Sequence, residues 1–200
     1  FNSMGVQPDS LATARFPSDV PYRIRVGAKE PPLSEARVAP LEGSGIRVGR
    51  TFRRHPRVAE SRPGQSGYVN RVSPLTPYFR ELLILRIGWD NQAVYEWAKH
   101  VGSVGRAREH GLEPEMIAAG PDAPGWDAFE VAHLHAADEM YRDGIVSEST
   151  WNELSERYDS REMMSVLMTV ANYRLVSMAL NAFGVQPQPT DELFPVVPRP

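Results

Sequence analysis

Residues 77–101, PYFRELLILRIGWDNQAVYEWAKHV, contain the pattern that decides the fold. The first half of this stretch is apolar nearly all round, as in a helix that is buried on every side. Thr76 can cap the start of that helix with its side-chain oxygen, and Pro77 suits the first helical position. Asp90 and Asn91 then interrupt the apolar run. The pattern therefore predicts one buried helix with a break at its end.

The chain beyond this break also has helical periodicity. A second helix is expected over about residues 92–110, ended by Gly111. Asp159 and Glu162 have the spacing of a capping box, which predicts the start of the last helix. No alternating strand pattern appears in the second half of the chain, so the sequence predicts an all-α helical bundle. The remaining helices are expected within EPEMIAAG (residues 113–120), 126–142, 148–158 and 160–183.

Proline divides the chain into regions. Eight of the 18 prolines lie in residues 1–63, where they prevent long uninterrupted helices. We therefore expect an extended Pro-rich N-terminal arm over residues 1–45, a helical domain over 46–187 and a Pro-rich tail over 188–200. Within the domain, the segment ESRPGQSG is predicted to be a loop that helps to close a pocket.

Composition excludes several classes of function. Charged residues make up 24% and hydrophobic residues 42% of the chain, the balance of a soluble globular protein. The net charge of −3 gives no reason to expect nucleic acid as a partner. We expect no membrane span and no signal peptide, and hence a cytoplasmic protein. The chain has no cysteine, which excludes disulfides, thiolate nucleophiles and Cys-ligated metals.

The segment YEWAKH contains the first candidate site residues. Glu96 and His100 lie one helical turn apart on the same face, a spacing that is also common in surface pairs. Gln92 and Ser103 share that face, and the polar stripe borders the apolar side that includes Trp97. A polar stripe beside the buried side is typical of a pocket wall. We therefore take His100 and Glu96 as catalytic candidates and the other three as substrate-binding candidates.

Glu81 introduces a carboxylate into the otherwise apolar face of the first helix, in line with Leu85. A buried carboxylate needs a partner or a shifted pKa, and an antiparallel hairpin of the two helices could supply His100. In the last helix, Asn172 and Tyr173 lie in a methionine-rich apolar context, which is more often core than binding surface. Both are kept as candidates for lining the cavity.

The order and spacing of RELLILRIGW, YEWAKHV, GLEPEMIAA and VANYRLVSMALNAFGV resemble the carboxymuconolactone decarboxylase family of the alkylhydroperoxidase-D-like (AhpD-like) superfamily. The resemblance covers roughly residues 75–187 and is to the longer members without cysteine. It implies an AhpD-like helical bundle that assembles as a homo-oligomer, either a trimer or a hexamer.

The thiol-using branch of this family has a relay glutamate before a CxxC pair, and a histidine four residues after the second cysteine. Counting back from His100 places Glu81 at the relay glutamate, with Ala93 and Glu96 at the two cysteine positions. Because both redox positions lack sulfur, a thiol peroxidase cycle is excluded. A Glu/Glu/His cluster remains, as the resemblance to the decarboxylase-like branch implies.

This cluster suits proton transfer at a carbon next to a carbonyl group. In this hypothesis His100 transfers the proton, Glu96 orients it, and Glu81 is the second acid or base. We expect a decarboxylase, isomerase or related lyase for a small cyclic or keto acid, with no cofactor and no metal. Two alternatives stay open: a non-catalytic oligomeric protein that binds a small ligand, and a metal-dependent oxygenase-like enzyme.

Overall fold

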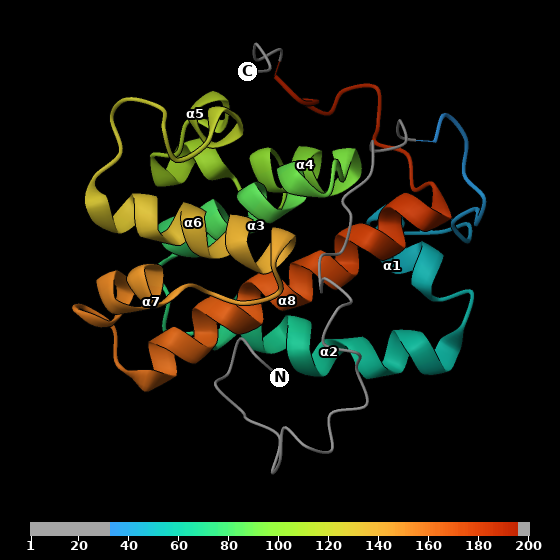
Figure 1. Ribbon diagram of the computed structural model, residues 1–200. Helices are drawn as coiled ribbons and strands as arrows, with labels where there is room; N and C mark the ends of the chain where they lie inside the picture. The colour runs from blue at the N-terminus through green and yellow to red at the C-terminus, as the bar shows by residue number, and fades with distance from the viewer. Residues whose placement is uncertain (1–32, 196–200) are drawn as a thin grey trace, which may run out of the picture.

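The structure is a computed structural model, and it describes residues 33–195. Within that range the protein is all helical, as predicted (Figure 1). The helices, in chain order, are α1 (Arg47–Phe52), α2 (Pro56–Arg71), α3 (Pro77–Asp90), α4 (Val94–Val101), the 3-10 helix η3 (Ala107–His110), α5 (Pro114–Ala119), α6 (Ala128–Arg142), α7 (Glu148–Ser155) and α8 (Ser160–Phe183).

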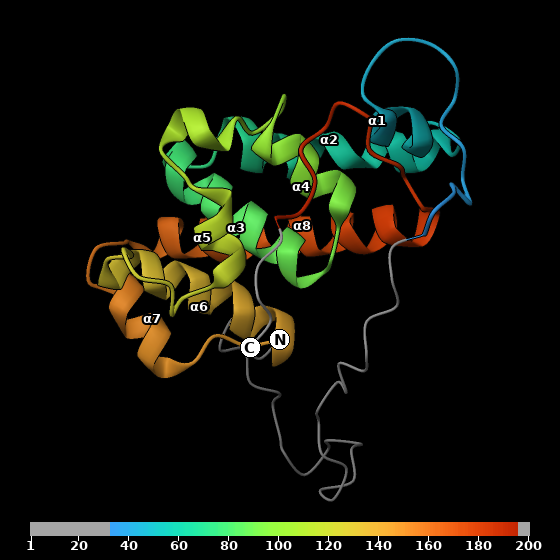
Figure 2. The same ribbon diagram turned by 90° about the horizontal axis from the view of Figure 1, so that it is seen from above.

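Two helices organise the bundle. Helix α3 is buried continuously from Glu81 to Gly88 and contacts α4, α5, α6 and α8. Helix α8 crosses the whole molecule, with α6 and α7 on one side and α1 and α2 on the other (Figures 1 and 2). The predicted cap of α3 is confirmed, because the Thr76 side chain accepts a hydrogen bond from the Phe79 amide. The apolar run thus forms the central helix of the fold.

The hydrophobic core has two main parts. One lies between α3, α6 and α8 and includes Ile84, Ala136 and Val170. The other surrounds Trp97 and includes Leu85 and Leu112. Both parts use α3, so its apolar character on all sides has a direct structural cause. The central helix is therefore fixed from two directions, which also fixes the side chains that it presents to α4.

The sequence predicted the bounds of helix α8 better than those of helix α4. Helix α8 begins with the predicted capping box of Asp159 and Glu162 and ends at Gly184, which has a left-handed φ of 65°. Helix α4 is shorter than predicted, because it ends at Val101. The chain then turns back so that Gly105 lies against the backbone of His100, and continuing the helix would remove this contact.

The prediction of a loop at ESRPGQSG is wrong, because these residues lie inside α2. Pro63 cannot donate a hydrogen bond and frees the carbonyl group of Ala59, but Pro63 and Gly64 lie on the exposed side of the helix. Gly67 and Val69 are buried on the other side, and α2 packs against α1 and α8. Tertiary packing therefore overrides the local preference of this segment.

The segments that flank the helices pack against the domain. Residues 33–45 contain no helix, and the amides of Arg37 and Val38 donate to the Phe183 carbonyl oxygen at 2.9 and 3.0 Å. In the tail, Phe194 packs on Trp97, with ring centroids 5.4 Å apart. The rest of the predicted arm and tail, residues 1–32 and 196–200, lies outside the described residues.

Helix α8 differs from the expectation that no segment could span a membrane. By length and composition it is the one helix of the described chain that could cross a bilayer. However, 61% of its most apolar window is buried inside the protein. A core helix of a soluble protein has the same properties, and here α8 packs along the core.

Candidate functional site

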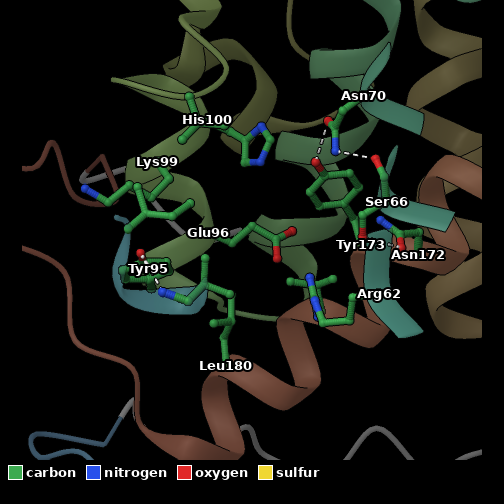
Figure 3. Close-up of a pocket in the computed structure, with 14 residues that line it drawn as sticks. Arg62, Ser66, Asn70, Tyr95, Glu96, Lys99, His100, Asn172, Tyr173 and Leu180 are labelled. Carbon is green, nitrogen blue, oxygen red and sulfur yellow. Dashed lines mark hydrogen bonds between the residues drawn. The ribbon is translucent and has the colours of Figure 1, made fainter. Parts of the chain in front are cut away.

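A pocket of about 160 Å³ lies between α2, α4 and α8 (Figure 3). Its apolar side chains come from the start of α1, from the turn after α4 and from α8, and its polar groups converge from three helices. The polar lining residues include Arg62, Ser66 and Asn70 of α2, Tyr95, Glu96, Lys99 and His100 of α4, and Asn172 and Tyr173 of α8. An apolar cavity with a few convergent polar groups is the usual form of a small-molecule site.

The predicted contact between Glu81 and His100 is confirmed. The Oε2 atom of Glu81 lies 2.6 Å from Nδ1 of His100, and both side chains are buried. Burial alone would raise the pKa of Glu81, but His100 and Arg80 together hold it below its usual range. An ionised Glu81 only accepts hydrogen bonds, so Nδ1 carries the hydrogen. In the neutral ring, Nε2 is then left as the basic atom.

Glu96 has a different environment from Glu81. Its side chain is buried, and neither carboxyl oxygen has a hydrogen-bond partner among residues 33–195. Burial raises the pKa of Glu96 well above its ordinary value, and the charge of Glu81 adds to this effect. The nearby Ser177 hydroxyl and the Arg62 guanidinium oppose the shift but do not cancel it. The protein therefore favours the protonated, neutral form of Glu96.

His100 is bonded to a different glutamate from the one that the sequence placed as its orienting partner. The sequence paired Glu96 with His100 because the two residues lie one turn apart on α4. In the structure the His100 ring is bonded to Glu81 on α3 instead, and no hydrogen bond joins it to Glu96. Residues that share a helix face need not bond to each other when another helix offers a buried partner. Glu81 is thus the carboxylate that is bonded to His100, and Glu96 is the buried carboxyl without such a bond.

Two predicted binding residues of α8 line the pocket. The Tyr173 ring stands perpendicular to the His100 ring, with centroids 4.9 Å apart, and its hydroxyl donates to Oδ1 of Asn70 at 2.8 Å. Asn172 accepts a hydrogen bond from the Ser66 hydroxyl at 3.3 Å. Its Nδ2 atom is buried without a partner in the described part of the chain. These contacts fix both side chains in the pocket wall, and Tyr173 lies against His100.

The other three predicted binding residues do not line this pocket. Gln92 lies in the turn between α3 and α4, where its amide donates to the Trp89 carbonyl oxygen at 2.6 Å. Trp97 is fully buried in the core. Ser103 is exposed beyond the end of α4. The structure gives none of them a place in the cluster around His100.

The segment ESRPGQSG was predicted to help close the pocket, and Arg62 and Ser66 of this segment do line it, but the sequence reasoning missed the helix α2 that holds them. Arg62, Ser66 and Asn70 are spaced four residues apart, so they share one face of the helix and point into the pocket region (Figure 3). This periodicity is visible in the sequence, but Pro63 and Gly64 led to the prediction of a loop. A polar residue at every fourth position was the signal that could have identified this wall.

Metal binding was one of the open alternatives. Within residues 33–195, no group of three or more His, Cys, Asp or Glu side chains is arranged to hold a metal ion. His133, which the sequence places near His135, is bonded instead to the Phe129 carbonyl oxygen and the Tyr158 hydroxyl. Burial lowers the pKa of His133 to about 4, so it is a neutral core residue.

No protein-family model matches the sequence, and no curated protein matches it significantly. Solved structures do match. A protein of unknown function from Agrobacterium tumefaciens, suggested to be the antioxidant defence protein AhpD, aligns with a TM-score of 0.61 and 17% identity over 68% of this chain and 94% of its own. An uncharacterized peroxidase-related protein from Silicibacter sp. TM1040 aligns with a TM-score of 0.63 and 16% identity over 72% of this chain and 76% of its own.

A third structure, described as an alkylhydroperoxidase AhpD core from Ralstonia eutropha JMP134, is an uncharacterized peroxidase-related protein with a TM-score of 0.62 and 17% identity over 70% of this chain and 75% of its own. The chain has the AhpD-like fold. The predicted resemblance is thereby confirmed at the level of the fold, and the chain differs from thiol-dependent peroxidases because it has no cysteine.

In this AhpD-like bundle, Gly105 is the point where the chain passes behind the Glu81–His100 pair. A Cβ atom at Gly105 would lie 2.2 Å from Oε2 of Glu81 and 2.4 Å from the His100 carbonyl oxygen. We expect Gly105→Ala to push the pair apart and to lower the free energy of unfolding by about 1–3 kcal/mol, the usual cost of overpacking. Urea unfolding followed by circular dichroism measures this change.

Gly88→Ala is the matched control, because its added Cβ would meet only Glu96, at an ordinary contact distance of 3.8 Å. Equal stability of the Gly105→Ala and Gly88→Ala variants would contradict the close approach at Gly105.

The raised pKa of Glu96 predicts a pH dependence of stability. A carboxyl that is more basic in the folded than in the unfolded state stabilises the fold most below its unfolded pKa. That contribution is lost as the pH rises from the ordinary range of a glutamate towards the raised native value. Glu96→Gln removes the titration, so its melting temperature should fall less with rising pH than that of the wild type.

The groups that face Glu96 are Arg62 of α2, Glu81 of α3 and Ser177 of α8. Glu81 acts in the opposite direction, because its lowered pKa contributes stability that is lost as the pH falls. The comparison therefore uses the difference between wild type and Glu96→Gln, in which the contribution of Glu81 is common to both. If the melting temperatures of wild type and Glu96→Gln change in parallel between pH 4 and pH 9, the raised pKa of Glu96 is contradicted.

Proposed function

We propose that the protein is a cofactor-independent acid/base enzyme, a decarboxylase, isomerase or related lyase, that acts on a small cyclic or keto acid. One observation carries the proposal: the same small pocket holds an oriented base and a neutral acid. His100 is bonded to ionised Glu81, and Glu96 is buried without a partner among the described residues. Two carboxyl groups with pKa values shifted in opposite directions are typical of acid/base sites.

In the proposed reaction, Nε2 of His100 removes a proton from the carbon next to a carbonyl group. The electron pair of the C–H bond forms the new C=C bond, and the carbonyl oxygen takes the proton of Glu96. The product is an enol. Where this enol is conjugated with a second C=C bond, the imidazolium returns its proton to the far carbon of that system, and the enol O–H proton goes back to Glu96 as the carbonyl group re-forms, which completes an isomerisation. Glu81 stabilises the imidazolium that forms, because it already accepts the hydrogen of Nδ1.

The size of the pocket supports a small substrate. Its volume of about 160 Å³ is below the roughly 300–1,000 Å³ of sites for drug-sized ligands. The resemblance to the cysteine-free, decarboxylase-like branch of the AhpD-like proteins supports the same reaction class. A peroxidase cycle through a disulfide has no residues to support it, because the chain contains no cysteine.

The proposal is tested by exchange of hydrogen for deuterium at the carbon next to the carbonyl group. Cyclic and linear keto acids of four to seven carbons are incubated with the protein in D₂O and chelator, and the loss of the proton signal is followed by NMR. We expect at least one keto acid to exchange faster with wild type than with His100→Ala. Binding of keto acids without exchange of any of them would favour the alternative, a non-catalytic ligand-binding protein.

We further propose a cytoplasmic homo-oligomer, a trimer or hexamer, as the resemblance implies. The outer face of α8 supports self-association, because large apolar side chains are exposed along one stripe of that helix: Met164, Met168, Leu175 and Met178. Contact with a second copy would cover this apolar surface. Light scattering measures the mass, and a strict monomer at micromolar concentration would contradict the proposed assembly.

A further inference from the structure

We propose that Arg62 and Asn172 bind a carboxylate group of the substrate, and that this anion enters through an outer groove lined by arginines. The inference rests on the proposed function only for the reaction that the bound keto acid undergoes. The binding site itself is argued from side chains that the acid/base chemistry does not use.

Arg62 places a cation at the mouth of the pocket. Its guanidinium is partly buried, lies 3.8 Å above the centre of the Phe52 ring and points towards Glu96 (Figure 3). No carboxylate in residues 33–195 forms a salt bridge with it, and its nearest acid, Glu96, favours the neutral form. A guanidinium without a carboxylate partner presents paired N–H donors to an anionic ligand.

Asn172 adds a second donor beside Arg62. The Ser66 hydroxyl is bonded to the Oδ1 atom of Asn172, so the amide directs its NH₂ group elsewhere. That group is buried, in a residue that is only 5% exposed, and has no hydrogen-bond partner in the described part of the protein. A buried donor without an acceptor is unfavourable unless a ligand supplies one. A carboxylate offers one oxygen to Arg62 and one to Asn172.

An outer groove adjoins this site. A hollow of about 500 Å³ shares Arg62, Ser66 and Asn70 with the inner pocket and is also lined by Arg53 and Arg71. No aspartate or glutamate of residues 33–195 lines it. Three arginines without an acid among them produce a local positive potential in a protein whose net charge is −3. Such a potential raises the local concentration of small anions and their rate of binding.

The position of the carboxylate narrows the reaction class. A carboxylate that is held by Arg62 stays ionised and fixed at the mouth, so the carbonyl group further along the molecule lies nearer Glu96 and His100. The structure therefore favours isomerisation or elimination at that carbonyl over loss of the bound carboxylate. The ligand class is a small keto acid in which the carboxylate serves for recognition.

Isothermal titration calorimetry tests the site with keto acids of four to seven carbons and their neutral methyl esters, at low salt and without any assay of turnover. We expect a keto acid to bind about tenfold or more tightly than its ester. Arg62→Met should weaken binding of the acid by about 10- to 100-fold and leave the ester unchanged, and Arg62→Lys should recover part of the loss. Added salt should weaken binding of the acid but not binding of the ester.

Arg57→Met is the matched control, because it removes the same charge from an exposed position of the same helix, outside both hollows. Circular dichroism checks that every variant is folded. Failure of all the acids to bind, equal affinity for acids and esters, or an equal loss in Arg57→Met and Arg62→Met would overturn the inference. Selective binding of acids without deuterium exchange would support the carboxylate site and reject the proposed function. Equal deuterium exchange of acids and esters would support the proposed function and reject the carboxylate site.

Discussion

Replacement of His100 by alanine is expected to lower turnover of the substrate by about 10²–10⁴, the range for loss of a general acid or base. The reason is that Nε2 of His100 is the basic atom of the pocket and Glu81 fixes its orientation through Nδ1. Glu81→Gln should cause a loss in the same range. Because the two residues act as one unit, the double variant should lose far less than the product of the two single losses.

The controls separate chemistry from folding. His135→Ala removes a partly buried histidine of α6 that does not line the pocket, and it should keep full activity. Free imidazole should restore part of the activity of His100→Ala, because it can occupy the space that the ring leaves. Full activity of His100→Ala, or a loss that tracks only its melting temperature, would reject the assignment of His100 as the base.

Glu96→Gln is expected to cause the second large loss, again about 10²–10⁴ in turnover. The amide matches the size of the neutral acid but has no proton of comparable acidity to give to the carbonyl oxygen. In the wild type, activity should fall as the pH rises through the raised pKa of Glu96, because the acid is lost there. The variant should lack this descending limb, and a pH–rate profile measures the difference.

Glu109→Gln is the matched control for charge, because Glu109 is exposed on η3 and does not line the pocket. A wild-type rate and an unchanged alkaline limb in Glu96→Gln would show that Glu96 is not the acid. In that case its buried carboxyl would have a structural role, and the oriented histidine alone would have to account for activity.

The sequence predicted the elements whose signals are local. Thr76 before Pro77, and Asp159 before Glu162, mark helix starts through contacts within one turn, and both caps are present. The contact between α3 and α4 was also predictable, because a carboxylate on an apolar helix face requires a partner. Helix α2 was not, since Pro63 and Gly64 are unfavourable locally and only packing against α8 and α1 compensates for them.

The parts of the site that could not be predicted depend on side-chain direction and on the end of α4. Periodicity placed Ser103 on the helix face, but the helix ends at Val101. Trp97 turns into the core, where Phe194 of the tail covers it. The roles of Glu81 and Glu96 depend on which of them meets the charges of other elements, and spacing along one helix contains no such information.

The central claim is that one pocket holds Glu96, whose raised pKa keeps it protonated above the ordinary range of a glutamate, beside an ionised Glu81 that is bonded to His100. Infrared difference spectroscopy of wild type against Glu96→Gln, at a pH above the ordinary range of a glutamate pKa, tests it most directly, because it needs no substrate. The account predicts a carbonyl band of a protonated carboxylic acid in the wild type that is absent from Glu96→Gln and that disappears when the pH rises through the raised pKa. A carboxylate band for Glu96 as soon as the pH exceeds the ordinary range of a glutamate pKa, with no protonated acid lost in the variant, would contradict the account.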